Sequence, residues 1–240
     1  MKFTQVAADT FSKLQLNAGV LLTEFDPSDP ELDRSKIFGA TGGGVSFTAA
    51  AEYVDFGEDI DNVPANTKEL KKLDSVTATM SGTFKAADTA LAKNLIGAAD
   101  VDPATGKVTP RVDLISADFI DVWWVGDYSD VNTGDDAGFM AIHLINALST
   151  GGFQIQSNNK GKGDFAFEFT GHYSMNDITI VPYELYIKGS DVTYTPVTPV
   201  GTENPSEEGW YERSGTEESY VYTLTTDTTV DSSKTYYERS

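Results

Sequence analysis

Two segments of strictly alternating side chains constrain the fold of this 240-residue chain more than any other feature. In residues 45–52 and 75–85, apolar side chains alternate with small polar ones. A period of two predicts half-buried strands, with one face on a core and the other in water. The polar face carries hydroxyls where surface strands usually carry charges. The hydroxyl-bearing positions include Ser46, Thr48, Thr77, Thr79 and Ser81. Such a smooth face suits a wall past which something slides, or a close contact between copies of the chain.

A long connection, residues 53–73, joins the two predicted strands. Its first half is acidic and its second half is basic, with a short helical turn expected around the lysines. Connections of this length inside compact domains are uncommon and are usually functional or disordered. We therefore predict a contact site here, although a surface excursion that pairs its charges with itself is an open alternative. The candidate contact residues are Asp55, Phe56, Glu58, Asp59, Asp61, Lys68, Lys71 and Lys72.

One α-helix is predicted, over residues 88–96. Asp88 offers a carboxylate to cap the first turn, and Leu91 and Leu95 form an apolar stripe. Gly97 supplies the residue that ends the helix. A helix this short cannot form a core alone, so we expect it to lie against a sheet.

The other patterns predict a mainly β fold. Further strands are expected over residues 16–25, 120–125, 164–175 and 182–188, with turns at 26–30 and 127–138 and a flexible glycine entry at 41–44. Residues 139–148 are apolar at both parities, so a strand and a buried helix remain open. The inward faces are expected to include Phe165, Phe167, Phe169, Tyr173 and Met175 in one strand, and Tyr183, Leu185 and Ile187 in the next.

The composition changes after residue 190. We expect a main domain over residues 1–190, a proline-punctuated linker over 191–201 and a small extension over 202–240, rich in Thr and Tyr. The extension contains a short echo, because Trp-Tyr-Glu-Arg-Ser at 210–214 recurs as Tyr-Tyr-Glu-Arg-Ser at 236–240. A small β-meander with aromatic cross-strand pairs and an unstructured tail are both compatible with this composition.

Charge and cysteine content exclude several classes of function. The formal net charge is −20, which argues against ordinary nucleic-acid binding and favours either simple solubility or a surface that repels polyanions. The absence of cysteine excludes disulfides and thiolate zinc sites. No apolar run reaches the length of a membrane span, and the N-terminal residues lack the apolar core of a secretion signal. We expect a soluble protein that is made in a cytoplasm.

Residue constellations for catalysis are missing from the sequence. His143 and His172 have no partner at a metal or triad spacing, so both are expected to be structural. The glycine runs at 42–44 and 151–152 are not followed by the lysine of a phosphate-binding loop. The acidic segment 127–136 lacks the ligand spacing of a calcium loop. We therefore expect no enzyme activity, no cofactor and no metal site.

Three stretches, in this order and spacing, resemble a known family. They are 56–74 (beginning Phe-Gly-Glu-Asp-Ile-Asp), 121–130 (Asp-Val-Trp-Trp-Val-Gly-Asp-Tyr-Ser-Asp), and 138–157 followed by 165–175. The set is similar to the major tail proteins, or tail tube proteins, of long-tailed, non-contractile phages and prophages of Gram-positive bacteria. The resemblance covers about residues 14–190, and no single motif within it is diagnostic.

The resemblance implies a β-sandwich or barrel with one flanking helix, and a virion protein whose hexameric rings stack into a tube. The tube would be the conduit for DNA ejection, and DNA would pass without specific binding. The partners implied are further copies of the chain, a tape-measure protein, and tail terminator and distal tail proteins, with no membrane. Under this hypothesis residues 53–73 connect successive rings, and the hydroxyl face lines the lumen. The alternative places that face on the outside.

A rival hypothesis is a secreted or surface β-sandwich that binds carbohydrate. It would use Trp123, Trp124 or the aromatic side chains of the extension. Those of the extension could also contact a cell surface if it projects from a tube. A monomer with glycan affinity favours the rival, and rings or tubes exclude it.

Overall fold

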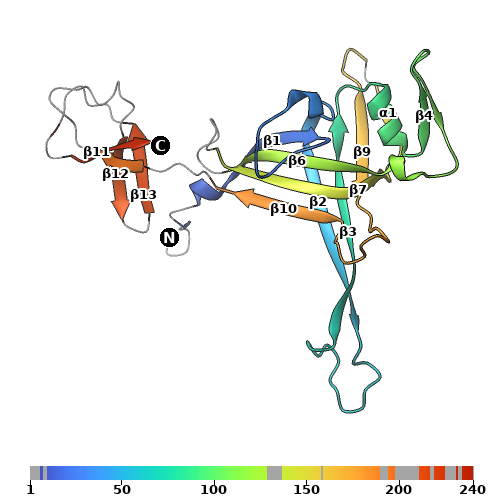
Figure 1. Cartoon of the computed structure of the whole chain (residues 1–240), viewed down its shortest axis with the longest axis horizontal. Helices are drawn as coiled ribbons and strands as arrows, with labels where there is room; N and C mark the ends of the chain where they lie inside the picture. Colours follow the sequence, from blue (N-terminus) through green and yellow to red (C-terminus); the bar gives the residue numbers. More distant parts are fainter. Residues whose placement is uncertain are drawn as a thin grey trace. The chain divides into compact units, whose positions relative to one another are not determined.

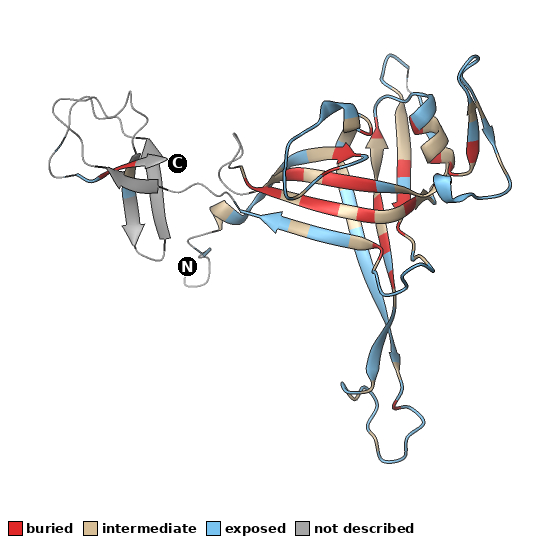
Figure 2. Ribbon diagram, viewed as in Figure 1, coloured by how far each residue is buried: buried red, intermediate tan, exposed pale blue. Residues whose placement is uncertain are grey.

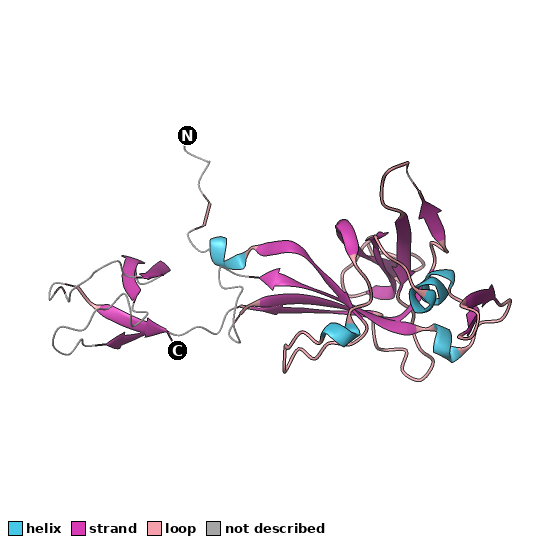
Figure 3. Ribbon diagram, turned by 90° about the horizontal axis from the view of Figure 1, so that it is seen from above, coloured by secondary structure: helices cyan, strands magenta, loops and turns pink. Residues whose placement is uncertain are grey.

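In the residues that the structure describes, the chain forms a mainly β structure with one α-helix, as the sequence predicts, in a computed structural model (Figures 1 and 3). The structure describes residues 6–7, 10–128, 137–157, 159–189, 194–197, 211–216, 219–224, 231 and 234–239. Their contacts define two units, which are described separately below. The larger unit comprises residues 17–126 and 140–186, and the smaller comprises 1–16, 127–139 and 187–240.

An eight-stranded sheet dominates the fold. Its strands are β1 (Gln15–Leu22), β2 (Thr41–Asp55), β3 (Lys71–Phe84), β6 (Ile120–Tyr128), β7 (Phe139–Ser149), β8 (Gln154–Gln156), β9 (Asp164–Thr170) and β10 (Tyr183–Lys188). The order is β1-β6-β7-β9-β3-β2, with β10 paired to β7 and β8 to β9. Residues 139–148, for which the sequence did not distinguish a strand from a buried helix, therefore form a strand, β7.

The sheet folds over on itself to enclose one core, as in a β-sandwich. Strands that are not hydrogen-bonded neighbours pack face to face: Phe47 of β2 contacts Tyr183 of β10, with ring centroids 5.4 Å apart. The core cluster joins Leu21 of β1 to Phe84 of β3 and Phe169 of β9. Alternation therefore predicts the buried face of β3 correctly, because Val76, Ala78, Met80 and Phe84 are all buried.

The single α-helix, α1 (Thr89–Ile96), closes one side of the core. The Asp88 carboxylate accepts the backbone N–H of Leu91 at 2.7 Å, and Gly97 ends the helix at φ +86°. Leu91 and Leu95 are buried in the core, and the Ser149 hydroxyl donates to the Leu95 carbonyl at 2.7 Å. Local capping and an apolar stripe thus suffice to define this element, and the prediction is confirmed.

Short elements complete the larger unit. They are the hairpin of β4 (Ala99–Asp102) and β5 (Lys107–Pro110), and the 3-10 turns Arg34–Lys36 and Ser116–Asp118; a third 3-10 turn, Phe11–Lys13, belongs to the smaller unit. Arg111 holds the segment after the hairpin, because its guanidinium contacts the buried Asp118 carboxylate at 2.6 Å and lies 2.9 Å from Asp100. The guanidinium thereby offsets part of the cost of burying this carboxylate.

The glycines that we expected to form a flexible entry are part of strand β2. The β2–β3 register shifts between Thr41 and Val45, and Gly43 and Gly44 have φ of +83° and +85°. The strand pairing is irregular here, and glycine adopts the left-handed backbone of these two positions without steric cost. The prediction of a flexible entry at 41–44, ahead of a strand that begins at Val45, is therefore wrong.

Two predicted inward faces extend too far. Strand β9 ends at Thr170, and Tyr173 and Met175 are exposed, Met175 to 92%. The next residue, Gly171, is buried, and an added Cβ there would lie 2.6 Å from the Pro182 carbonyl oxygen. In β10 only Tyr183 packs on the core, and the side chains of Leu185 and Ile187 are exposed.

His143 lies at the centre of a network on the outward face of β6, β7 and β10. Its ring stacks on Trp123, with centroids 3.9 Å apart and planes 5° from parallel. Its Nδ1 lies 3.2 Å from the Glu184 carboxylate, and its Nε2 lies 3.6 Å from the Asp121 carboxylate. The Tyr186 hydroxyl also donates to Glu184 at 2.7 Å. Side chains from three strands are thereby joined.

This network predicts a loss of stability in acid. The neighbouring His143 lowers the pKa of Asp121 below 3.8, and the Tyr186 hydroxyl, with His143, lowers the pKa of Glu184 below 4.5. A depressed folded pKa stabilises the fold above the ordinary value, and this contribution is lost as the pH falls through the folded value. We expect the free energy of unfolding, measured by urea titration, to decrease as the pH is lowered past about 4. In His143→Gln that acid-dependent loss should be smaller, and an identical pH profile would contradict the assignment.

The extension contains a separate four-stranded sheet. Its strands are β11 (Tyr194–Val197), β12 (Tyr211–Thr216), β13 (Ser219–Leu224) and β14 (Tyr236–Arg239), in the order β11-β14-β12-β13. β11 falls inside the predicted linker, so the folded part of the extension begins earlier than the composition indicates. Most of the acidic turn at 127–138 and all of the connection around Trp210 lie outside the described residues.

Candidate assembly surface

Strands β2 and β3 continue past the sandwich as a two-stranded ribbon (Figure 1). We call residues 49–75 the arm. Its strands stay paired up to Asp55 opposite Lys71, with a register shift between Glu52 and Tyr53. At about 3.3 Å per residue, the paired part alone is on the order of 20 Å long. The two alternating segments of the sequence are thus the base of a much longer hairpin.

The arm is exposed on both faces (Figure 2). Gly57 is the only buried residue in the arm, all of which the structure describes. Its large apolar side chains nevertheless face solvent: Tyr53, Val54, Phe56, Ile60 and Leu73. An isolated two-stranded ribbon is marginally stable in water, and clustered exposed apolar side chains mark interaction sites. The arm therefore has the properties of a surface that becomes covered.

The tip of the arm, residues 56–70, is an ordered turn system. The Asp55 carboxylate accepts the backbone N–H groups of Gly57, at 2.9 Å, and of Asn66, at 2.6 Å. These two hydrogen bonds lower the pKa of Asp55. The backbone N–H of Phe56 donates to the Leu70 carbonyl at 3.1 Å and closes the base of the tip. The tip thus holds its shape through backbone contacts and carries Phe56 in a defined place.

The predicted connection was too long by several residues at each end. Asp55 is the last residue of β2, and Lys71 and Lys72 belong to β3, so these lysines lie on a strand and not on a helical turn. Lys68 lies 3.6 Å from Glu69, its neighbour in the chain. The remaining acidic candidates, Glu58, Asp59 and Asp61, are all exposed at the tip. The arm is therefore acidic at its end and basic where its second strand begins.

Removing the Asp55 carboxylate should loosen the tip without unfolding the sandwich. In Asp55→Ala we expect the amide protons of Gly57 and Asn66 to exchange roughly tenfold faster, because each loses a charge-assisted hydrogen bond. Hydrogen exchange followed by NMR measures this, and Asp59→Ala is the matched control at an exposed carboxylate. Equal exchange rates in the two variants would contradict the capping role.

The hydroxyl face extends over three strands. Residues opposite one another share a face, and Ser46, Ser81 and Glu168 form one row across β2, β3 and β9. Thr48, Thr79 and Thr170 form the next row. Thr150 adds its hydroxyl, 2.9 Å from that of Thr170 and 3.1 Å from the Glu168 carboxylate. Ser46, Thr48 and Thr77 are exposed, while Thr79 and Ser81 are half-buried.

β2 is also the edge of the sheet. In the described part of the chain it has a paired strand, β3, on one side only, while it runs over Thr41–Asp55. A long edge offers unpaired backbone groups to another chain, and proteins normally shorten, charge or cover such edges. The only charged side chains along β2 are Glu52 and Asp55, both in its last part. The sequence-based reading of a strand pair did not identify this edge, because strand order depends on distant segments.

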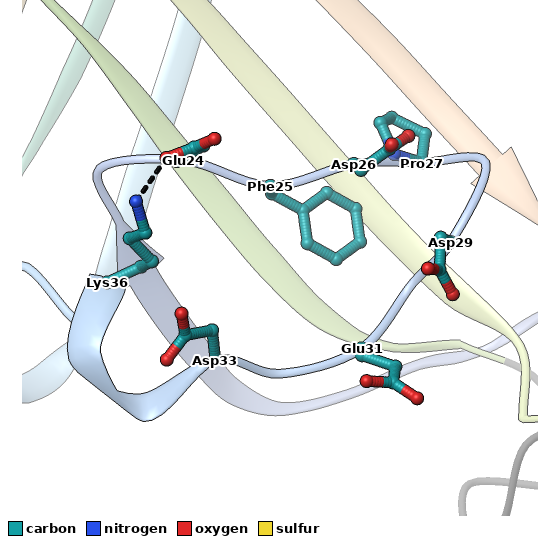
Figure 4. Close-up of a pocket in the computed structure, with 8 residues that line it drawn as sticks. All are labelled: Glu24, Phe25, Asp26, Pro27, Asp29, Glu31, Asp33 and Lys36. Atoms are coloured by element: carbon teal, nitrogen blue, oxygen red, sulfur yellow. Dashed lines mark hydrogen bonds and ion pairs between the residues drawn. The ribbon is translucent and has the colours of Figure 1, made fainter.

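An open pocket of about 390 Å³ lies beside the loop between β1 and β2 (Figure 4). Its lining residues are Glu24, Phe25, Asp26, Pro27, Asp29, Glu31, Asp33 and Lys36. The carboxylates mainly organise the loop: Asp26 accepts from Ser28 at 2.8 Å, Asp33 accepts from Ser35 at 2.8 Å, and Glu24 pairs with Lys36. The pocket therefore presents an acidic loop whose carboxylates are partly engaged.

Among the described residues, no three His, Asp or Glu side chains are arranged to hold a metal ion. No helix in the described residues is long and apolar enough to cross a membrane. A scan against models of protein families finds no match for the chain, and a search of curated proteins finds none either.

Proposed function

We propose that the chain is a structural virion protein whose rings stack into the tail tube of a long-tailed phage. The observation that carries the proposal is the arm: a ribbon exposed on both faces that presents Tyr53, Phe56 and Leu73 to solvent. A neighbouring copy that covers these side chains would remove the cost of their exposure. That the assembly is a tail tube is proposed from the resemblance of the sequence to tail tube proteins.

The edge of the sheet supports closure into a ring. A strand from the next copy that pairs with β2 would satisfy its outer backbone groups, and a closed ring of such pairs leaves no edge free. Ring closure uses one contact and stacking uses another, both heterologous. The arm extends away from the sandwich and so can bridge from one ring to the next. We propose hexameric rings on the family resemblance.

The hydroxyl face is our candidate for the lumen wall. It carries Ser46, Thr48 and Thr77 exposed, with Glu168 at its border, and Lys85, just after β3, is paired with the Asp164 carboxylate. With a net charge of −20, the assembled wall would repel DNA over only about 8 Å at physiological salt. Such a wall lets DNA pass and accommodates a tape-measure protein, while terminator and distal tail proteins would cap the ends.

Electron microscopy of the purified protein tests the assembly. We expect rings or tubes in negative stain once the protein is concentrated enough for the arm of one copy to bind the next. A monodisperse monomer at every concentration examined would overturn the proposal. The same preparation decides against the carbohydrate-binding alternative if tubes are present. Two of that alternative's candidate residues, Trp123 and Trp124, are buried and so are not exposed platforms for a sugar ring.

Cysteine labelling tests which face lines the lumen. The chain has no native cysteine, so a single Thr77→Cys thiol reports on the hydroxyl face alone. Thr77 is exposed in the single chain, and a bulky maleimide should therefore label the unassembled variant rapidly. In intact tubes we expect labelling at least about tenfold slower, because the lumen restricts access. Equal rates in the two states would place the face outside.

A further inference from the structure

The C-terminal sheet is built from two copies of one sequence pattern. Each copy has Tyr-Thr in its first half, at 194–195 and at 222–223, and Tyr-Glu-Arg-Ser in its second half, at 211–214 and at 237–240. In the structure each copy supplies two strands, β11 and β12 from the first and β13 and β14 from the second. We call residues 194–216 the first repeat and residues 219–239 the second repeat.

Backbone pairing treats the two repeats alike. β11 pairs with β14 and β12 pairs with β13, both antiparallel and in the same register. The matching pairs are Tyr194–Arg239 with Tyr222–Arg213, Thr195–Glu238 with Thr223–Glu212, and Pro196–Tyr237 with Leu224–Tyr211. At the centre Tyr211 is opposite Tyr237, its own equivalent. The order β11-β14-β12-β13 is therefore unchanged when the repeats are interchanged, which is pseudo-two-fold symmetry.

Neither repeat pairs with itself. Among the described residues of this sheet, every strand pairing joins the first repeat to the second. Side-chain contacts also cross between them: the Arg213 guanidinium lies 5.0 Å from the Tyr237 ring, and Lys234 lies 3.0 Å from the Glu212 carboxylate. Tyr236 and Tyr237 are buried. A single repeat therefore lacks a partner for both of its strands.

We propose that this sheet is a strand-exchange site, in which a repeat from a second copy of the chain takes the place of a chain's own. Because the two repeats share register and strand-end residues, the exchanged sheet keeps the same pairings and needs no new contact. Effective concentration decides the outcome: the chain's own repeat is favoured in dilute solution, and a neighbour's repeat when chains are crowded together. The inference does not depend on the proposed tube.

Mixed single-cysteine variants of the full-length chain test the exchange. Thr195→Cys and Glu238→Cys chains are unfolded together, refolded at high concentration and treated with a short bismaleimide. Thr195 and Glu238 are opposite each other on β11 and β14, so exchange should give cross-linked heterodimers. The Thr195→Cys/Glu238→Cys double variant, cross-linked within one chain when dilute, verifies that the sheet forms.

The matched control mixture is Thr195→Cys with Thr223→Cys, whose strands β11 and β13 lie at opposite ends of the sheet. We expect several-fold more heterodimer from the Thr195→Cys and Glu238→Cys mixture than from this control. Equal yields would overturn the proposal. An excess in the control would also overturn it, because it would mean that sheets associate by their edges.

A chain that ends at Thr216 provides a second test, because it lacks both strands of the second repeat, β13 and β14. Such a chain has only the first repeat, so exchange predicts that two copies complete one sheet between them. Thr195 of one copy should then be opposite Glu212 of the other, by equivalence with Glu238. Cross-linking of Thr195→Cys to Glu212→Cys in this shortened chain should exceed that in the full-length chain several-fold, and no increase would overturn the proposal.

Discussion

Replacing Phe56 by aspartate is expected to weaken assembly at least about tenfold while leaving the single chain folded. Phe56 is 63% exposed at the tip of the arm. Removing its phenyl group should therefore cost the folded monomer little stability. In an assembled state the same side chain would be covered, and aromatic anchors at interfaces typically contribute 2 kcal/mol or more, about 30-fold in affinity. We expect the concentration needed for tube formation to rise at least about tenfold.

Sedimentation and negative-stain microscopy over a concentration series measure this effect. Glu58→Gln is the matched control, because it changes an exposed tip residue without removing an apolar side chain. Phe56→Leu should retain most of the assembly, since it keeps apolar surface. If Phe56→Asp assembles as readily as the unchanged chain, the arm tip is not an assembly contact. The main support for the proposed function would then be lost.

Truncating Phe84 to alanine is expected to cost about 3–5 kcal/mol of the free energy of unfolding. Phe84 is fully buried at the end of β3, and its ring lies 4.5 Å from that of Phe167 and 5.8 Å from that of Phe38, measured between centroids. These rings fill the space between the sheet and α1, so alanine leaves a cavity that the rigid sheet cannot close.

Urea denaturation followed by tryptophan fluorescence measures the change. Phe153→Ala is the control, because Phe153 is 43% exposed and its removal should cost less than about 1 kcal/mol. A loss below about 1 kcal/mol for Phe84→Ala would mean that the core relaxes around it, and would contradict the rigid packing described above. The m-value should be unchanged if both variants unfold in one step.

Signals that act within a few residues were predicted well. The helix followed from the Asp88 cap, the Leu91 and Leu95 stripe and the Gly97 end, each of which acts within one or two turns. The alternation in β3 correctly gave its buried face. The single helix and the mainly β class followed from the same local patterns, because period and capping depend on neighbouring side chains alone.

Errors arose where distant segments decide the outcome. Alternation extends past the end of the core, so Ala49 and Ala51 share the face of Phe47 and are nevertheless exposed. Tyr173 and Met175 continue the pattern of β9, but the strand ends at Thr170, before Gly171 packs closely against Pro182. A period reports which side a side chain points to, and only the packing of other strands decides whether that side is covered.

The sequence alone determined the class of this protein, a mainly β chain with a capped helix, and it indicated a hydroxyl-rich strand face and a strongly acidic chain. The tertiary structure decided where the two alternating strands lie. It placed β2 at the edge of the sheet and carried β2 and β3 beyond the core as the arm, because the strand order and the extent of the core depend on contacts between residues far apart in the chain. It also showed that the echo in the extension is a pair of interlocked repeats. Backbone register is set by pairing between strands, and a sequence contains the repeated residues without stating which strand each will join.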